Sequence, residues 1–192
     1  MGTQLSNEVE AVRAVLQRFQ DGYTRRSLDN LNEFMTMFVS DDTLEVIGTG
    51  ALKPGEFEWC LGLAATRELV ENDWKGWGDL VLDVQGARIY TSGDAAWLAT
   101  NATVNMTIPA EQGYADHISY LRARLAEETP AARDLLLDIV RGGSNTLFEF
   151  EQGEHFVWPL RFTAVLVRRE GRWLFHQMQF SHANTRFPDE RL

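Results

Sequence analysis

The sequence predicts an α+β fold, in which helices come first along the chain and an antiparallel sheet follows. Apolar residues recur at steps of three and four early in the chain and again near residues 63–74, which is the period of helices. From Trp77 onward, apolar and polar residues alternate as they do in strands. The last two strands frame a hairpin turn at Glu170-Gly171. Helices grouped before such a sheet are typical of α+β folds rather than of doubly wound sheets.

Three N-terminal helices are predicted from apolar stripes and from their ends. Asn7 fits the start of the first helix, because Glu10 three residues later completes a pattern like a capping box. The second helix follows Ser27, and the third covers about 63–73. Their stripes contain, in chain order, Val9, Val12, Leu16, Phe19, Tyr23, Leu28, Leu31, Met35, Phe38, Leu69, Val70 and Trp74.

The strands are predicted from alternation and from the turns between them. They run over 43–48, 80–90, 95–108, from 148 or 155 to 169, and over 173–182. Gly86 marks a bulge or bend within the second of these, and Pro159 places an edge or a bulge in the fourth. Residues 184–192 are expected to be irregular.

Two further helices interrupt the strands at about 113–142. The stripe Tyr114, Ile118, Leu121 and Leu125 forms the first; Thr129-Pro130 fits the start of the second and Gly142-Gly143 its end. The length of 192 residues suits a single domain over 1–192 that contains this insertion. Two helices cannot bury such stripes alone, so the insertion either covers a pocket mouth, which we favour, or extends a dimer interface.

Composition and charge exclude several classes of function. The formal charge is 18 − 28 = −10, which argues against nucleic acid as a partner. No apolar run approaches the ~20 residues that span a bilayer, so no membrane contact is expected. The N-terminus lacks a secretory pattern and Cys60 is the only cysteine, which suits a cytoplasmic protein. No nucleotide-binding or metal-binding motif occurs, and we expect neither a cofactor nor a metal ion.

Three segments in order carry a family resemblance. They are residues 38–42 (FVSDD), which lead into a short strand, residues 62–74, and residues 162–173, which end in Gly-Arg-Trp and continue to the run 179–181. The chain resembles the SnoaL-like domains of the nuclear transport factor 2 superfamily. This resemblance implies a cone-shaped α+β barrel, whose curved antiparallel sheet wraps around a long helix and encloses a pocket open at one end. It also implies a homodimer that forms through the sheet.

The resemblance suggests which face of the last strand looks into the pocket. Trp173 and Phe175 would face inward and, by strict alternation, Gln177 and Gln179 with them, which leaves His176 on the back of the sheet. Relatives often have His-x-His-x-Ser at the end of this strand. Because an amide cannot act as a general base near neutral pH, the two glutamines favour ligand orientation over proton transfer.

The candidate site combines one carboxylate with a set of polar and aromatic side chains. Glu45 lies between Leu44 and Val46 on the first strand, and a carboxylate among aromatics would have the raised pKa of a general base. A solvated carboxylate or a structural ion pair is the alternative. The residues expected to bind the ligand are Tyr23, Trp74, Trp77, Asn101, Arg161, Gln177 and Gln179. Arg161 could instead form a cross-strand ion pair, and the aromatic residues could simply belong to the core.

Three functions fit this sequence. The first is a cofactor-free cyclase, isomerase or dehydratase, the activities that the resemblance implies, in which Glu45 removes a proton next to a carbonyl group. The second is a binding module that holds a small hydrophobic molecule without chemistry. The third is a structural subunit of a larger complex, in which the helical insertion and the acidic surface make the contacts.

Overall fold

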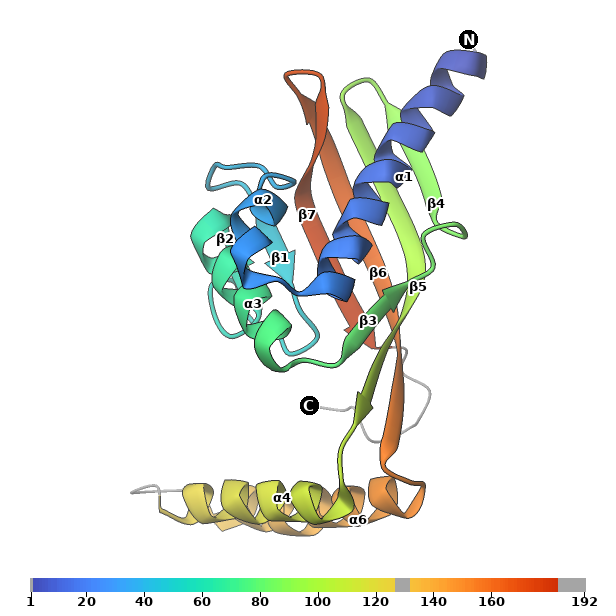
Figure 1. Ribbon diagram of the computed structural model, residues 1–192. Coiled ribbons are helices and arrows are strands. Elements are labelled where there is room, and N and C mark those ends of the chain that lie inside the picture. The colour runs from blue at the N-terminus through green and yellow to red at the C-terminus, as the bar shows by residue number, and fades with distance from the viewer. Residues whose placement is uncertain (1, 127–131, 183–192) are drawn as a thin grey trace. The chain divides into compact units, whose positions relative to one another are not determined.

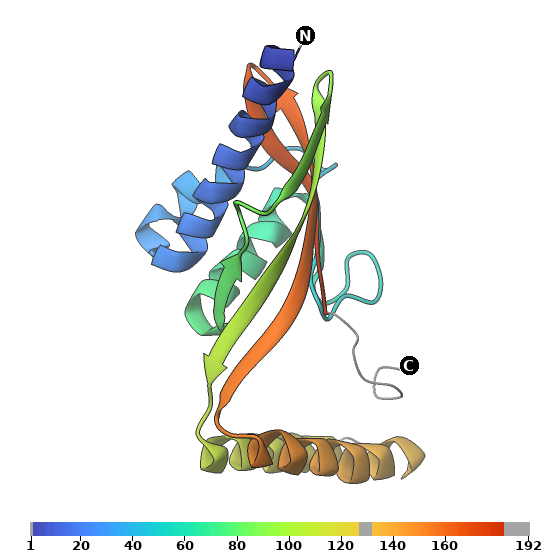
Figure 2. The ribbon, with the colours of Figure 1, turned by 90° about the vertical axis from the view of Figure 1, so that its right-hand side faces the viewer.

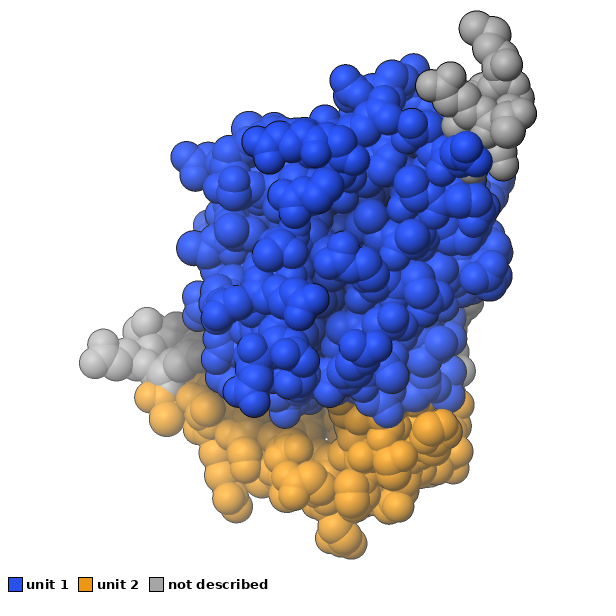
Figure 3. Space-filling view, turned by 45° about the horizontal axis from the view of Figure 1, so that its top comes forward, with its two compact units in different colours: residues 1–105, 157–192 blue, residues 106–156 orange. Residues whose placement is uncertain are grey.

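The structure is a computed structural model that describes residues 2–126 and 132–182, with side chains from residue 7 onward. The chain splits into two compact units (Figure 3). Unit 1 comprises Met1–Asn105 and Val157–Leu192, and unit 2 comprises Met106–Phe156. The second unit contains the predicted helical insertion of 113–142 and is longer than that insertion at both ends.

Unit 1 begins with the helices that the stripes predict. α1 (Gly2–Arg25) is followed by η1 (Leu28–Asn30), α2 (Leu31–Met35) and, after two short strands, α3 (Gly62–Gly76). The prediction that α1 begins at Asn7 is wrong, because the helix is already formed at Gly2. The side chain of Asn7 therefore lies within the helix and does not cap it.

One seven-stranded sheet forms the other layer of unit 1 (Figure 1). Its strands are β1 (Glu45–Ile47), β2 (Trp59–Leu61), β3 (Asp79–Leu82), β4 (Arg88–Ser92), β5 (Ala95–Thr107), β6 (His155–Arg169) and β7 (Arg172–His182). The order is β2-β1-β7-β6-β5-β3, and β4 also pairs with β5. The hairpin β6–β7 is antiparallel as predicted, whereas β1 runs parallel to β7, so the sheet is mixed.

Two strands differ from the sequence-based assignment. The predicted strand over 80–90 is divided into β3 and β4, because Asp83 stabilises a turn by accepting the backbone N–H of Gly86 at 2.8 Å. The short strand β2 was not predicted, since its three residues are too few to show an alternation.

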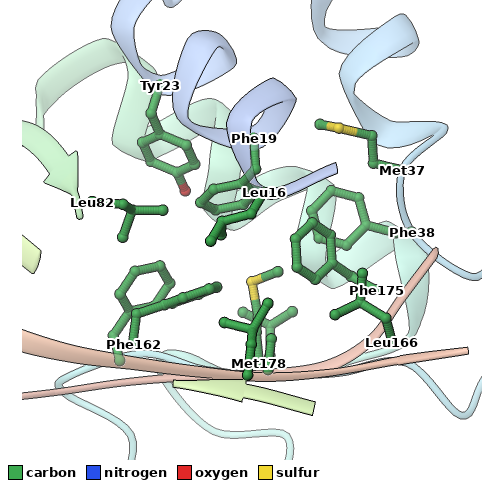
Figure 4. Packing of buried hydrophobic residues seen from close by; sticks show 14 of the residues in the cluster. Leu16, Phe19, Tyr23, Met37, Phe38, Leu82, Phe162, Leu166, Phe175 and Met178 are labelled. Carbon is green, nitrogen blue, oxygen red and sulfur yellow. The ribbon is translucent and has the colours of Figure 1, made fainter. Parts of the chain in front are cut away.

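The core of unit 1 lies between the helices and one face of the sheet. α1, α2 and α3 all lie on this face (Figure 2), which we call the inner face. Phe19 is at the centre, and its ring lies 5.7 Å from that of Phe162 on β6 and 5.4 Å from that of Phe175 on β7 (Figure 4). This packing confirms the predicted arrangement of N-terminal helices against a curved sheet. The face turned away from α1 is called the outer face below.

A bulge reverses the alternation of side chains along β7. Val165 pairs with Gln177 and the next residue, Leu166, pairs with Phe175, so His176 is an extra residue in β7. Before the bulge Trp173 and Phe175 are buried, and after it Met178 and Phe180 are buried. One extra residue shifts every later side chain to the opposite face. The prediction that Gln177 and Gln179 share the face of Trp173 is therefore wrong.

Unit 2 is built mainly of helices that follow the end of β5 and precede β6. They are α4 (Ala110–Leu125), α5 (Ala132–Leu137), the π-helical turn η2 (Asp138–Gly142) and α6 (Gly143–Glu151). The predicted helix end at Gly142-Gly143 is wrong, because η2 continues directly into α6. The long strand accordingly begins at His155 and not at Phe148. The predicted helix start at Thr129-Pro130 and the tail 184–192 lie outside the described residues.

Candidate functional site

A tyrosine and an aspartate meet inside unit 1. Tyr23 ends the apolar stripe of α1 and is 3% exposed. Its hydroxyl donates a hydrogen bond of 2.8 Å to Oδ2 of Asp73, which lies near the end of α3. Both residues are placed by their helices: the same stripe buries Phe19 one turn earlier, and Asp73 directly precedes the buried Trp74. The contact therefore joins two helices at the inner face of the sheet.

The surroundings change the acidity of both groups. The pKa of the Asp73 carboxyl is raised to about 6, chiefly by burial, and the negative charge of Glu58 acts in the same direction. The hydrogen bond from Tyr23 and the positive charge of Arg26 act in the opposite direction. Burial and the nearby Asp73 hold the pKa of Tyr23 well above its usual 10. At neutral pH the phenol therefore stays protonated, while the carboxyl is close to its titration range.

The pair lies at the wall of a small, partly open cavity. Its volume is about 20 Å³, which is room for about one water molecule. It is lined by Tyr23, Val46, Gly48, Thr49, Glu58, Thr66, Leu69, Val70, Asp73, Trp77, Met178 and Phe180. The lining is mainly apolar and includes two carboxyl groups, Glu58 and Asp73. A few polar groups among apolar walls are typical of sites for small organic molecules.

Glu58 is held at the cavity by the loop that connects β1 to β2. Its Oε2 accepts the backbone N–H of Gly50 at 2.7 Å, and its carbonyl oxygen accepts the N–H of Gly48 at 2.9 Å. A Cβ atom at position 48 would lie 2.3 Å from Oε2 of Glu58, so the close approach requires glycine there. The loop thus places a second carboxylate near Asp73.

Arg26 fixes the geometry between the ends of the two helices. Its guanidinium donates hydrogen bonds to the carbonyl oxygens of Trp77, at 2.6 Å, and of Gly78, and it lies 3.2 Å from the carboxylate of Asp79. Its Nε donates to the carbonyl oxygen of Tyr23 at 3.0 Å. Arg26 therefore connects the end of α1 to the segment after α3, and so supports the alignment of Tyr23 with Asp73.

The predicted base Glu45 lies outside this cavity. Val46 lines the cavity from β1, so alternation places Glu45 on the outer face of the sheet. There Oε1 of Glu45 accepts the indole N–H of Trp59 at 2.7 Å. Gln177 is the register partner of Glu45, and Gln179 is that of Ile47, which places both glutamines on the outer face as well.

Arg161 and Asn101 are also separated from the cavity. Arg161 is exposed between the buried Leu160 and Phe162, and it donates a hydrogen bond of 2.7 Å to the carbonyl oxygen of His182. Asn101 is exposed on β5 and alternates with buried neighbours. The structure therefore does not bring Glu45, Arg161 and Gln177 together in one enclosed cavity.

The predicted aromatic residues do lie on the inner side. Trp77 lines the cavity, and its ring lies 6.2 Å from that of Phe180 in an edge-to-face arrangement. Trp74 is buried against Tyr23, with ring centroids 6.3 Å apart and the planes at 88°. Three of the predicted ligand-binding residues, Tyr23, Trp74 and Trp77, are thus near the cavity, while the polar ones are not.

Sequence reasoning missed Asp73, Glu58 and Arg26. A signal for Asp73 was present: it lies three residues after Val70 and four after Leu69, so it shares the helix face that those residues bury. An acidic residue on an apolar stripe is seldom buried without a partner. Glu58 had no such signal, because a loop conformation places it.

Two groups with different acidities in one small cavity can transfer a proton. The Asp73 carboxylate can accept a proton from an adjacent carbon or oxygen atom, and its raised pKa makes it a stronger base than an exposed aspartate. The Tyr23 hydroxyl can donate a hydrogen bond to an oxygen atom on which negative charge develops. This arrangement requires no prosthetic group for general acid–base chemistry.

The family of the chain follows from sequence comparison. The sequence model of the SnoaL-like domain matches residues 12–126, which is more than half of the chain. The chain therefore belongs to the SnoaL-like domain family, as the resemblance predicted. Among curated proteins, none matches the sequence.

Comparison with solved structures supports the same fold at low sequence identity. An NTF2-like protein with a cystatin-like fold from Novosphingobium aromaticivorans aligns with a TM-score of 0.58, 11% identity and coverage of 97% of this chain and 88% of that chain. A candidate dehydratase of the NTF2-like family from Streptomyces avermitilis aligns with a TM-score of 0.57 and 9% identity. The alignment covers 92% of this chain and 96% of that chain. A candidate scytalone dehydratase from N. aromaticivorans aligns with a TM-score of 0.55 and 12% identity. The alignment covers 94% of this chain and 87% of that chain.

The described part of the chain has neither a candidate membrane span nor a cluster of metal-ligating side chains. None of its helices is both long and apolar enough to cross a bilayer. Residues 2–126 and 132–182 also contain no group of three or more His, Cys, Asp or Glu side chains that could hold a metal ion.

Proposed function

We propose that the protein is an enzyme that catalyses a cofactor-free isomerisation, cyclisation or dehydration of a small carbonyl compound. The observation that carries this proposal is the partly buried hydrogen bond between Tyr23 and Asp73 at the wall of a small, partly open cavity. The candidate dehydratases among the structural neighbours support the same class of reaction. Asp73 takes the role that the sequence assigned to Glu45.

The reaction would begin with proton abstraction. A carbon–hydrogen bond next to the carbonyl breaks, its proton moves to the Asp73 carboxylate, and its electron pair forms an enolate. Tyr23 donates its hydrogen bond to the enolate oxygen instead of to Asp73, which lowers the energy of the charged intermediate. In a dehydration, the proton on Asp73 then leaves with the β-hydroxyl group as water. In an isomerisation, the proton returns to a different carbon atom.

The substrate class follows from the lining. Apolar side chains such as Met178, Phe180 and Trp77 favour a small hydrophobic molecule, and the two carboxyl groups disfavour an anionic one. A cavity of about 20 Å³ admits such a molecule only if side chains move. The β1–β2 loop, which carries Glu58, is the part of the wall that we expect to move.

Deuterium exchange tests the proposal without knowledge of the natural substrate. The protein is incubated in D₂O with a β-hydroxyketone and with a β,γ-unsaturated cyclic ketone, and exchange next to the carbonyl is followed by NMR. We expect Asp73→Asn to slow exchange by at least about 100-fold, and Tyr23→Phe by roughly 10- to 100-fold. The rate should rise with pH through about 6, because the base must be ionised.

Glu45→Gln is the variant that discriminates between the two carboxylates. Its exchange rate should stay within about twofold of that of the unaltered protein, since Glu45 lies on the outer face. A loss in Glu45→Gln together with full activity in Asp73→Asn would contradict the assignment. A protein that accelerates neither reaction would count against an enzyme and favour the non-catalytic binding module.

A further inference from the structure

The cavity beside Tyr23 and Asp73 is too small to hold a substrate as it stands. Its volume of about 20 Å³ is room for about one water molecule, whereas a carbonyl compound has several heavy atoms. A substrate can therefore reach Asp73 only when part of the wall moves. The parts of the wall are held in different ways, and this difference indicates which of them moves.

Much of the wall belongs to the packed core of unit 1. Val46 on β1, Val70 on α3 and Met178 on β7 are each at most 3% exposed and are part of the continuous apolar core. Thr66 on α3 is fully buried beside them. Displacement of such closely packed side chains would open voids elsewhere in the core. We therefore expect these parts of the wall to stay in place.

The β1–β2 loop, residues 48–58, forms a different part of the wall. Gly48, Thr49 and Glu58 line the cavity from the two ends of this loop. Residues 52–57 between them are all exposed, with Leu52 at 57% and Phe57 at 83%. The middle of the loop therefore has little packing to lose when the loop moves.

The side chain of Glu58 fastens the β1–β2 loop. The backbone bond from the N–H of Gly48 to the carbonyl oxygen of Glu58, at 2.9 Å, continues the pairing of β1 with β2. The bond from the N–H of Gly50 to Oε2 of Glu58, at 2.7 Å, is made by a side chain in an exposed position. A carboxylate is a strong acceptor, but water can take the place of an exposed partner. Loss of this one side-chain contact would therefore free the loop.

Phe57, the residue before Glu58, opposes the fastened conformation. Its φ angle is +51°, in the left-handed region that a bulky residue adopts only at a cost in free energy. The side chain gains little in return, because the residue is 83% exposed. An open loop would let this backbone return to an ordinary negative φ. The loop thus combines a contact that holds it, at Glu58, with a strain that favours its release, at Phe57.

Gly48 makes the contact of Glu58 possible. A Cβ atom at position 48 would lie 2.3 Å from Oε2 of Glu58 and 2.6 Å from its Cβ, so a larger residue would displace the carboxylate. The φ angle of Gly48 is not positive, and the backbone conformation itself does not require glycine. Alanine at this position is therefore a second way to release the loop, and it leaves the charge of Glu58 in place.

We propose that the β1–β2 loop is a lid over the cavity, which the Glu58 carboxylate latches shut and the strained backbone at Phe57 biases toward opening. When the latch is released, Gly48, Thr49 and Glu58 leave the wall, and the cavity becomes accessible to a small carbonyl compound. Glu58 thus controls access and takes no part in proton transfer. The inference rests on the proposed function in one respect, that the substrate binds in this cavity, and not on which reaction follows.

A thiol in the cavity wall reports whether the lid is open, and it needs no substrate. Thr66→Cys places a thiol of similar size in the wall, and Cys60→Ala removes the only natural thiol. The full chain with both changes is treated with methyl methanethiosulfonate, a small thiol reagent, and intact mass gives the labelling rate. In this background we expect Glu58→Ala and Gly48→Ala each to raise the rate by about tenfold or more.

Glu58→Gln is the matched control, because it removes the charge but keeps an oxygen atom that can accept the N–H of Gly50. Its labelling rate should stay within about threefold of that of the background protein. The same is expected of Glu56→Ala, which removes an exposed carboxylate from the same loop. Far-UV circular dichroism should show that every variant remains folded under the labelling conditions.

Phe57→Asn tests the strain, because asparagine tolerates a left-handed backbone better than phenylalanine does. It should slow labelling by roughly threefold. Equal rates in Glu58→Ala and Glu58→Gln, or faster labelling in Phe57→Asn, would overturn the lid, and the reaction assigned to Asp73 would still stand. The expected labelling rates without any deuterium exchange would support the lid and remove only the reaction.

Discussion

The two units of this protein use similar apolar residues with opposite results. In unit 1, α1 buries Val12, Leu16, Phe19 and Tyr23 against a sheet that covers the whole stripe. In unit 2, α4 has a stripe of the same spacing, yet Ile118 and Leu125 remain about half exposed. A stripe therefore predicts that a helix has an apolar face, but the covering element determines whether that face is buried. Unit 1 contains its own covering layer, whereas the described part of unit 2 leaves much of its apolar surface uncovered.

The largest expected effect is at the centre of the unit 1 core. Phe19 is fully buried and lies 4.9–5.7 Å from four other rings, those of Tyr23, Phe34, Phe162 and Phe175. Phe19→Ala should lower the free energy of unfolding by about 3–5 kcal/mol, through lost burial and the cavity that it leaves. Chemical denaturation measures the change. A loss below ~1 kcal/mol would show that this core is not as tightly packed as the structure describes.

At Asp73 we expect a smaller effect in the other direction: a substitution that raises the free energy of unfolding. The pKa of Asp73 is about 6 in the folded protein and near 3.8 when the chain is unfolded. The folded state therefore holds the proton more tightly, and stability falls as the pH rises from about 4 to about 6. Asp73→Asn removes this penalty while its amide oxygen still accepts the Tyr23 hydroxyl. It should stabilise the protein at pH 7 by on the order of 2 kcal/mol.

The control is the pH dependence of the stability difference between Asp73→Asn and the unaltered protein. The stabilisation by Asp73→Asn should disappear at pH 4, where the aspartate is protonated in the folded state. Thermal unfolding at both pH values measures it. Destabilisation of Asp73→Asn at pH 7 would indicate that the ionised carboxylate supports the fold, which is the structural role and not the catalytic one.

The smallest effect is expected on the surface of unit 2. Val140 is 64% exposed, so Val140→Ser should change the free energy of unfolding by less than about 0.5 kcal/mol. Chemical denaturation measures this. A loss of more than about 1 kcal/mol would mean that the folded chain buries this residue.

The fold could be predicted from the sequence where periodicity is long and local. The stripe from Val12 to Tyr23 and the hairpin around Glu170-Gly171 contain enough repeats to identify α1, β6 and β7. Short elements such as β2 contain too few residues to show a period. At Gly142-Gly143, the usual signal of a helix end is overridden, because the helix passes through it as a π-helical turn packed against His117.

The site was harder to predict because its positions depend on one bulge and one loop. An alternation rule places Gln177 and Gln179 with Trp173, and a single extra residue at His176 moves both to the outer face. Glu58 reaches the cavity only through the conformation of the β1–β2 loop. Tyr23 was predicted as a ligand-binding residue, and the structure supplies its hydrogen-bond partner, Asp73, which the sequence reasoning overlooked.

Titration of the Asp73 carboxyl by carbon-13 NMR is the decisive test of the Tyr23–Asp73 pair. We expect a midpoint of about 6 for the Asp73 side-chain carbon. In Tyr23→Phe we expect a higher midpoint, because the hydrogen bond from Tyr23 lowers the pKa of Asp73. A midpoint at the ordinary aspartate value of about 4, unchanged in Tyr23→Phe, would contradict a buried proton-transfer pair at this cavity.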